Sequence, residues 1–297
     1  MKIGVMLPVG GNDGPTGEMP TWADTKAIAL AADEAGLDSV WLADHFFYQA
    51  PDDTIHGMHE SWTLLTAVAA VTQRVEVGNM VLCASFRDPG LTAKMAATLD
   101  MVSDGRLILS VGAGWHDPEY EAFGLPTDHR VGRFEEWLEI VARLLRKETV
   151  TFEGKYHQAK DVALAPPPAR QIPILVASFR PRMLELTARW ADQWNTAWFG
   201  KVDDKVKLRI ASMQAALAAA GRPADEVEIT VGITVTDPEQ PPVAEPEPDA
   251  IIGTVEELAQ AFKEYDGLGV THLIVGTEPP TVRSAVRLAE AKRLAFG

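Results

Sequence analysis

Residues Arg74–Gly124, RVEVGNMVLCASFRDPGLTAKMAATLDMVSDGRLILSVGAGWHDPEYEAFG, contain two strand-like runs separated by a helix-length segment. Val75–Cys83 and Leu107–Val111 are rich in β-branched and aliphatic residues, and Pro89–Val102 between them has apolar residues three and four positions apart. This order predicts a β-α-β unit with parallel strands. Because parallel sheets bind ligands at the carboxyl ends of their strands, functional residues are expected just after each run.

The composition and charge of the chain limit the class of protein. Its 297 residues, 46% of them hydrophobic, suffice for one sizeable core, so we expect a single domain over residues 1–297. The single cysteine, Cys83, excludes an intrachain disulfide, and the first residues resemble a short strand rather than a signal peptide, which predicts a cytoplasmic protein. The formal net charge of -15 opposes binding to nucleic acid or anionic lipid, and no apolar stretch reaches the roughly 20 residues of a membrane span.

Strand-like runs alternate with helical patterns along the whole chain. Eight alternations in about 300 residues, without a glycine-rich nucleotide fingerprint, predict a (β/α)8 TIM barrel with insertion segments rather than an open doubly wound sheet. The runs are Ile3–Pro8, Ser39–Ala43, Val75–Cys83, Leu107–Val111, Pro173–Ala177, Asp192–Ala197, Val227–Val235 and His272–Val275.

Helix ends and long loops also have sequence signals. Thr21 and Asp24 open a helix that Gly36 closes, and Thr254 with Glu257 forms a capping-box pattern. The last of four longer interruptions is rich in Pro and Glu and follows the seventh strand, so we expect a mobile loop that acts as a lid. The interruptions are Gly10–Pro20, Trp115–His129, Thr149–Gln171 and Thr236–Ala250.

A set of short motifs occurs in a fixed order along the chain. They are Leu37–Trp41 with Asp44-His45-Phe46, Val75–Cys83 with Arg87-Asp88-Pro89, Gly112–Trp115, Ile174–Ser178 with Pro181–Leu184, Ile251–Thr254 and Gly269–His272. Together these motifs resemble the bacterial luciferase-like monooxygenase superfamily, and most of all its branch of F420-dependent oxidoreductases. The resemblance implies a barrel that binds the deazaflavin coenzyme F420 at its carboxyl face, with FMN as the alternative cofactor. It also implies a homodimer, because members of the superfamily commonly pair.

His45 follows the second predicted strand and is flanked by Asp44 and Phe46. An imidazole in this place can exchange a proton with a substrate or with the flavin edge near neutral pH, whereas the alternative is a histidine that only hydrogen-bonds a neighbouring strand end. In the F420 branch a histidine in the matching Asp-His pair lies at the active site, which favours a catalytic His45. We expect Asp44 to orient the loop or the coenzyme.

Met80, Val81 and Leu82 lie near the end of the third predicted strand and are expected to pass beneath the coenzyme ring. By resemblance, the Met80-Val81 peptide bond is a non-proline cis bond in a bulge that supports the ring, and an ordinary buried strand is the alternative. Cys83 has no activating neighbour in the sequence, so we interpret it as a small core residue.

Gly112 and Gly114 follow the fourth predicted strand and allow the backbone to approach a ligand closely. Trp115 and His116 come next, and we interpret Trp115 as a wall for a ring or apolar substrate and His116 as a candidate proton carrier. Some F420-dependent dehydrogenases of the superfamily carry a glutamate proton donor at the position of Trp115. The tryptophan argues against their acid-base scheme and their sugar-phosphate substrate.

The loop after the fifth predicted strand is a candidate phosphate site. Pro181 suits the first turn of a helix, and helix amides, the helix dipole and nearby arginines attract an anion. The resemblance places the coenzyme phosphate here, and the alternative is a pair of solvated surface arginines. The expected cofactor-binding residues are Ala177, Ser178, Phe179, Arg180 and Arg182.

Two other polar clusters are assigned no function. His56, His59 and Glu60 are not at the end of the first strand, where metal-dependent barrel hydrolases carry paired histidines, so no metal site is predicted. The charged residues that open the helix running to Arg146 are expected to form surface or inter-helix ion pairs. They are Arg130, Arg133, Glu135 and Glu136.

The sequence thus predicts an oxidoreductase that moves a hydride between C5 of F420 and a small organic substrate, with His45 as the proton source. Aromatic residues in several loops favour an apolar or ring-containing substrate. An FMNH2-dependent monooxygenase is the alternative among enzymes. A barrel that binds flavin or F420 without catalysis is the alternative of another class.

Overall fold

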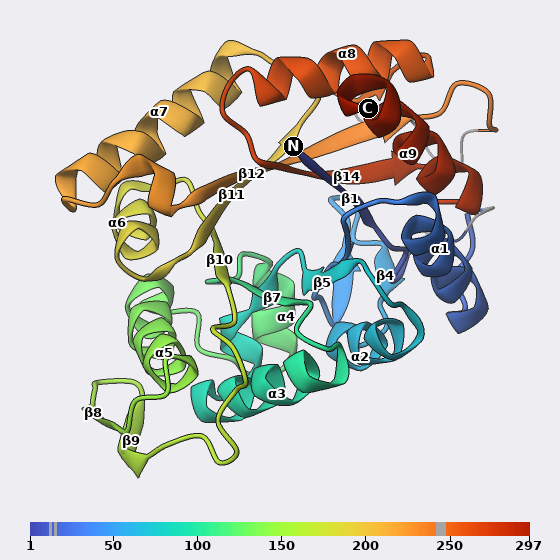
Figure 1. Cartoon of the computed structure of the whole chain (residues 1–297). Helices are drawn as coiled ribbons and strands as arrows, with labels where there is room; N and C mark the ends of the chain where they lie inside the picture. The colour runs from blue at the N-terminus through green and yellow to red at the C-terminus, as the bar shows by residue number, and fades with distance from the viewer. Residues whose placement is uncertain (12–13, 15–16, 242–247) are drawn as a thin grey trace.

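The computed structural model describes residues 1–11, 14, 17–241 and 248–297. Eight parallel strands of this part of the chain close into a barrel, because β7 pairs with β10 and β14 pairs with β1 (Figure 1). In order around the barrel the strands are β1 (Lys2–Met6), β2 (Ser39–Leu42), β5 (Glu76–Asn79), β7 (Leu107–Gly112), β10 (Ile174–Ala177), β11 (Gln193–Phe199), β12 (Glu228–Thr236) and β14 (His272–Glu278).

Helices surround the barrel and connect its strands (Figure 1). They are α1 (Trp22–Ala35), α2 (Ser61–Val71), α3 (Pro89–Val102), α5 (Arg130–Leu145), α6 (Pro181–Trp190), α7 (Asp204–Ala219), α8 (Val255–Asp266) and α9 (Val282–Phe296). The smaller elements are the hairpins β3 (Phe47–Gln49) with β4 (Ile55–Gly57) and β8 (Val150–Glu153) with β9 (Gln158–Val162), the short strands β6 (Leu82–Cys83) and β13 (Ile251–Ile252), the helix α4 (Asp117–Ala122), and the 3-10 turns η1 (Ala84–Phe86) and η2 (Ala224–Glu226).

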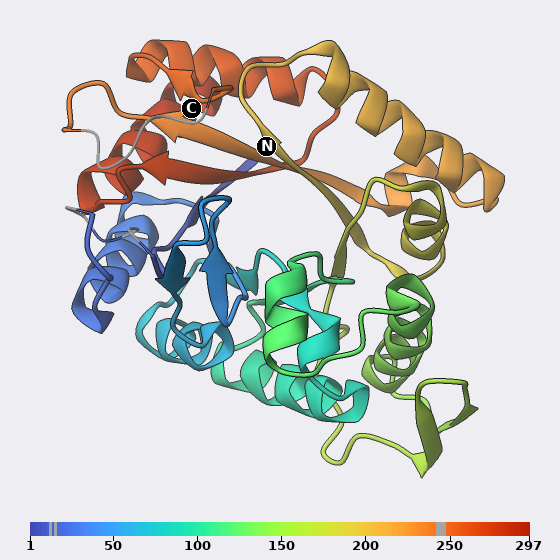
Figure 2. The same ribbon diagram turned by 180° about the vertical axis from the view of Figure 1, so that it is seen from behind.

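The predicted (β/α)8 barrel is confirmed, and each predicted strand lies on one barrel strand except the third. The predicted run Val75–Cys83 is divided into β5 and β6, with a cis peptide bond at Met80-Val81 between them. The two hairpins were not predicted. The β3–β4 hairpin and α4 lie next to each other at one end of the barrel (Figure 2).

Helix capping follows the sequence signals. Thr21 and Asp24 form a capping box at the start of α1, and Gly36 ends the helix with a φ of 92°. Thr254 and Glu257 form the second capping box, at the start of α8. Part of the predicted lid, Thr236–Ala250, and part of the interruption Gly10–Pro20 lie outside the described residues. Within the described part of the chain, no helix is long and apolar enough to span a membrane.

The barrel interior contains an apolar layer under its carboxyl end. Trp41, Ile108, Leu175 and Ile274 form this layer, and Met6, Met80 and Val81 pack against it. Trp41 fits because the strand beside it carries glycine: a Cβ on Gly78 would lie 2.5 Å from the Trp41 ring. The layer closes the barrel from within and supports the cavity above it.

Candidate active site

A cavity of about 660 Å³ opens at the carboxyl ends of the strands, on the side of β2, β5, β7, β10 and β11. Its volume lies in the range of pockets that hold cofactors and small molecules. Most of the residues predicted for the site line this cavity. They are Asp44, His45, Met80, Val81, Gly112, Gly114, Trp115, Ala177, Ser178, Phe179 and Arg180.

Three residues predicted for the site lie elsewhere. Leu82 is fully buried in the apolar core. His116 is 5% exposed, and its Nε2 accepts a hydrogen bond from the Gln49 amide at 3.0 Å, so it holds the β3 strand in place. Burial lowers the pKa of His116, which favours the neutral ring. Arg182 forms a salt bridge of 2.6 Å with Glu135 at the surface.

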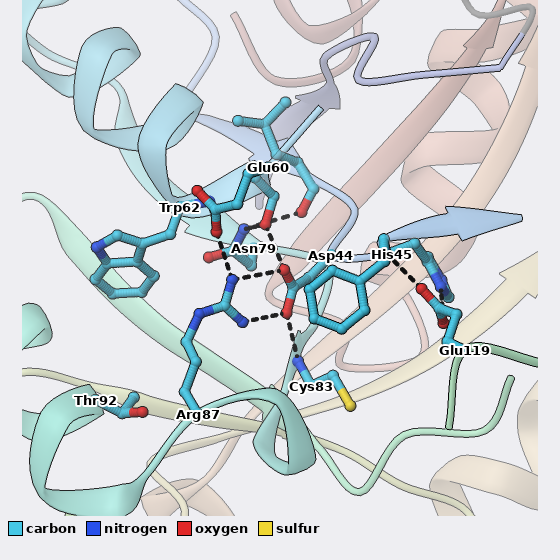
Figure 3. Close-up of polar contacts among 12 residues, drawn as sticks. Asp44, His45, Glu60, Trp62, Asn79, Cys83, Arg87, Thr92 and Glu119 are labelled. Carbon is cyan, nitrogen blue, oxygen red and sulfur yellow. Dashed lines mark hydrogen bonds and ion pairs between the residues drawn. The ribbon is translucent and has the colours of Figure 1, made fainter. Parts of the chain in front are cut away.

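His45 lies in the cavity wall, and its ring is oriented by a carboxylate. Nδ1 of His45 lies 2.9 Å from Oε2 of Glu119 (Figure 3). The imidazole also meets the Trp115 ring edge-on, at 5.7 Å between centroids. An ionised Glu119 only accepts hydrogen bonds, so Nδ1 carries the proton and Nε2 is left for a proton transfer. The pairing gives His45 the arrangement expected of a general acid or base.

Glu119 is a cavity-lining residue that sequence reasoning missed. Its side chain is 1% exposed, and a buried carboxylate is tolerated only when its oxygens are hydrogen-bonded. Oε2 meets His45, and Oε1 accepts the backbone N–H of Phe46. The available signal was the pair Asp117-Pro118, which starts α4 and brings Glu119 into its first turn.

Asp44 supports the loop that carries His45. Arg87 donates to both carboxylate oxygens of Asp44, at 2.7 and 3.0 Å, while the Ser61 hydroxyl and the Cys83 amide donate at 2.7 and 2.8 Å (Figure 3). Glu60 accepts a further bond from Arg87 at 2.6 Å. Burial disfavours the charged guanidinium, but these carboxylates outweigh it and raise the pKa of Arg87. These hydrogen bonds connect Asp44, which follows β2, to Cys83 and Arg87 on either side of η1. The network fits the prediction that Asp44 orients the loop.

Cys83 lies in the cavity wall as a protonated thiol. Burial raises the pKa of Cys83 to about 11, and its Sγ lies 3.4 Å from the Tyr120 hydroxyl. The hydroxyl of Tyr120 donates to the Ala113 carbonyl at 3.0 Å. A thiol with so high a pKa is a poor nucleophile, in agreement with its interpretation as a packing residue.

Two features of the backbone shape the cavity. The Met80-Val81 peptide bond is cis, as predicted, and a second non-proline cis bond, Ala197-Trp198, was not predicted. Gly114 has a φ of 79°, and a Cβ there would lie 1.9 Å from the Tyr120 hydroxyl. Only glycine fits this position, so the backbone itself forms that part of the wall.

The end of the cavity near α5 and α6 carries positive groups. Arg180 precedes Pro181, the first residue of α6, and no side chain caps this helix, so its first amides remain available to an anion. Arg130 also lines the cavity, with its guanidinium 4.0 Å above the Tyr120 ring, and it pairs with Asp117. Arg130 was expected to have a structural role only, but it also lies in the cavity wall.

Of the other charged residues at the start of α5, Arg133 and Glu135 form the predicted ion pairs, whereas Glu136 forms backbone hydrogen bonds that were not predicted. Arg133 pairs with Asp128, Glu135 pairs with Arg182, and Glu136 accepts backbone N–H groups of the β8–β9 turn. Within the part of the chain that the structure describes, no three His, Cys, Asp or Glu side chains are placed to hold a metal ion.

A cofactor-sized cavity at the mouth of a (β/α)8 barrel, with an imidazole-carboxylate pair in its wall, has the features of an enzyme active site. The sequence model of the family described as luciferase-like monooxygenase matches residues 1–247, and the chain belongs to this family. The relatives named below are oxidoreductases and monooxygenases.

Among curated relatives, the chain is 34% identical over 206 residues to the pyrimidine monooxygenase RutA of Methylorubrum extorquens, a match that covers 65% of this chain and 56% of the relative. It is 32% identical over 219 residues to the F420-dependent glucose-6-phosphate dehydrogenase of Kineococcus radiotolerans, covering 72% of this chain and 64% of the relative. The chain thus matches less than two thirds of the length of these relatives. A solved F420-dependent secondary alcohol dehydrogenase, bound to an F420-acetone adduct, shares the fold with a TM-score of 0.83 at 19% identity, covering 100% of this chain and 99% of that one.

Proposed function

We propose that this protein is an F420-dependent oxidoreductase that transfers a hydride between C5 of the deazaflavin and a small, apolar or ring-containing organic substrate. The observation that carries the proposal is the His45–Glu119 pair in the wall of the 660 Å³ cavity, beside Trp115. Bound F420 supplies the carbon that gives or takes the hydride. His45 gives or takes the accompanying proton at Nε2, and Glu119 holds the ring and stabilises its charged form.

The residues of the cavity fit a tricyclic ring with a phosphate-bearing arm. Met80, Val81 and Gly112 form an apolar wall, and a Cβ on Gly112 would lie 2.8 Å from a Val81 methyl group, so this wall is flat and closely packed. We assign the ring to this wall. The uncapped start of α6 with Arg180 is assigned to the phosphate.

Trp115 shapes the substrate side of the proposed site. Its ring is 63% exposed although it lines the cavity, so a bound molecule can cover it. Burying an aromatic face against an apolar molecule is favourable, whereas a phosphorylated sugar gains little from it. We therefore propose an uncharged substrate with an apolar body.

Equilibrium titration of the protein with F420 and, separately, with FMN tests the choice of cofactor. We expect F420 to bind at least tenfold more tightly, and its absorbance to change on mixing with a panel of alcohols, aldehydes and cyclic enones. Oxygen consumption that requires FMNH2 is the contrary result, and it would establish the monooxygenase. The RutA relatives support that second candidate, because they share as much identity with the chain as the F420-dependent relatives do. Tight binding without turnover across the panel would instead indicate a non-catalytic barrel.

A further inference from the structure

The side of the cavity opposite His45 contains the buried side-chain amide of Asn195. Asn195 lies on β11, whereas His45 follows β2, and three strands separate β2 from β11 in either direction around the barrel. Asn195 is fully buried and lines the cavity. A molecule that spans the mouth therefore contacts both residues.

Asn195 is hydrogen-bonded through its side-chain nitrogen and its backbone carbonyl. Its Nδ2 donates to the Thr230 hydroxyl at 2.8 Å, and its backbone carbonyl accepts the Ser178 amide at 3.1 Å. Its Oδ1, by contrast, has no hydrogen-bond partner among the described residues. A buried acceptor without a partner costs free energy, which a ligand recovers when it donates to that atom.

A second amide on the same strand provides an internal comparison. Gln193 lies two residues before Asn195, on the same face of β11, and is also buried. Its Nε2 donates to Glu228 at 3.1 Å, and its Oε1 likewise has no partner in the described structure. Gln193 does not line the cavity, so of the two amides only Asn195 borders it.

We propose that Asn195 is a ligand-recognition residue, whose Oδ1 accepts a hydrogen bond from the imide N–H of a flavin-type ring. The ligand class follows from the acceptor, Oδ1, that the amide leaves unpaired. One N–H of Nδ2 is engaged by Thr230, and Oδ1 is the buried atom left without a partner, so a ring edge that presents N–H satisfies it. This assignment rests on the proposed function, because it takes the ring to be that of F420 or FMN.

The test compares Asn195→Leu with the matched variant Gln193→Leu. Both changes remove one buried amide from the same face of β11, so both are expected to lower the melting temperature of the ligand-free protein to a similar extent. Binding of F420 and of FMN is measured by fluorescence titration. We expect affinity to fall about tenfold in Asn195→Leu and to stay within twofold of the wild type in Gln193→Leu. An equal loss in both variants, or no loss in either, overturns the assignment.

A chemically altered ligand identifies the donor. FMN methylated at the imide nitrogen lacks the N–H, so it should bind the wild type about tenfold more weakly than FMN. In Asn195→Leu the methyl group should cost no more than about twofold, whereas in Gln193→Leu, which keeps Asn195, it should cost about as much as in the wild type. If methylation lowers the affinity by the same factor in all three proteins, Asn195 does not accept a hydrogen bond from the imide N–H.

The outcome for Asn195 is separable from the outcome for the proposed function. If FMN binds and F420 does not, the F420-dependent activity is wrong, yet the comparison of Asn195 with Gln193 can be completed with FMN alone. If F420 binds tightly and Asn195→Leu has no effect, the activity stands and the recognition role is wrong. Binding of neither ring to the wild type overturns both.

Discussion

The mouth and the lower interior of this barrel each contain a histidine, and the partners of the two rings differ. His45, at the mouth, is 20% exposed and meets the carboxylate of Glu119, whereas His272 is fully buried and meets the hydroxyl of Ser39 at 2.7 Å. A carboxylate stabilises the charged ring, while a hydroxyl in an apolar interior does not. The two environments therefore differ, since His45 is paired with a carboxylate in the cavity wall, whereas burial keeps His272 as a neutral packing group.

The largest expected effect is the loss of activity on removal of the histidine at the mouth. His45→Ala should reduce turnover 10²- to 10⁴-fold, as expected for loss of a general acid or base, and change the Kd for F420 less than threefold. Steady-state kinetics and titration measure the two quantities. His56→Ala, on β4 outside the cavity, is the matched control and should retain activity. Unchanged turnover in His45→Ala would remove the proposed role.

The second expected effect is on stability and concerns the ion pair beneath His45. Asp44→Ala leaves the Arg87 guanidinium, 10% exposed, without its bidentate partner, so the free energy of unfolding should fall by about 3 to 5 kcal/mol. Urea denaturation measures this change. Glu135→Ala breaks the exposed pair with Arg182 and should cost less than about 1 kcal/mol. Equal losses in the two variants would mean that the buried network does not anchor the loop.

The third prediction concerns the lower interior. Burial lowers the pKa of His272 to about 3, whereas the unfolded chain takes up this proton near pH 6.5. The unfolded state therefore binds more protons between these two values, and the free energy of unfolding falls as the pH decreases. From pH 6.5 to pH 5 the loss from this group should be about 2 kcal/mol. His272→Gln should show a correspondingly flatter dependence in urea melts, and an identical slope in both proteins would contradict the prediction.

The fourth prediction tests whether the carboxylate, and not the position alone, distinguishes the two histidines. Glu119→Gln preserves the size of the side chain and its acceptor for the Phe46 amide, but it removes the charge beside Nδ1 of His45. Turnover should fall about tenfold while F420 affinity and melting temperature change little. Glu119→Asp restores the charge on a shorter side chain. If turnover recovers in this variant, the charge rather than the exact position of the carboxylate accounts for the effect. A fall in F420 affinity equal to the fall in turnover would instead indicate a structural role.

The barrel strands were predictable because most of them contain β-branched or aliphatic runs, and helices α1 and α8 because their capping boxes are visible in the sequence. His45 was predictable for the same reason, since it directly follows a strand. Glu119 was not, because its partner is 74 positions away in sequence and the short helix α4 lies inside a segment read as a loop. Asn195 was missed because it lies within a strand, where the sequence does not reveal which amide ends in a cavity.

The smallest expected effect is at Cys83, whose thiol lies in the same mouth as His45 but has no charged partner to activate it. With its pKa raised to about 11, the thiolate fraction at pH 8 should be roughly a hundredfold or more below that of an ordinary cysteine. Alkylation by iodoacetamide in the folded protein should therefore be very slow at pH 8 and accelerate only toward pH 11, while the urea-unfolded chain reacts at once. Rapid alkylation of the folded protein at pH 8 would show that the mouth stabilises anions at Cys83. The wall would then favour negative charge beyond the start of α6, and the phosphate arm could no longer be assigned to that end alone.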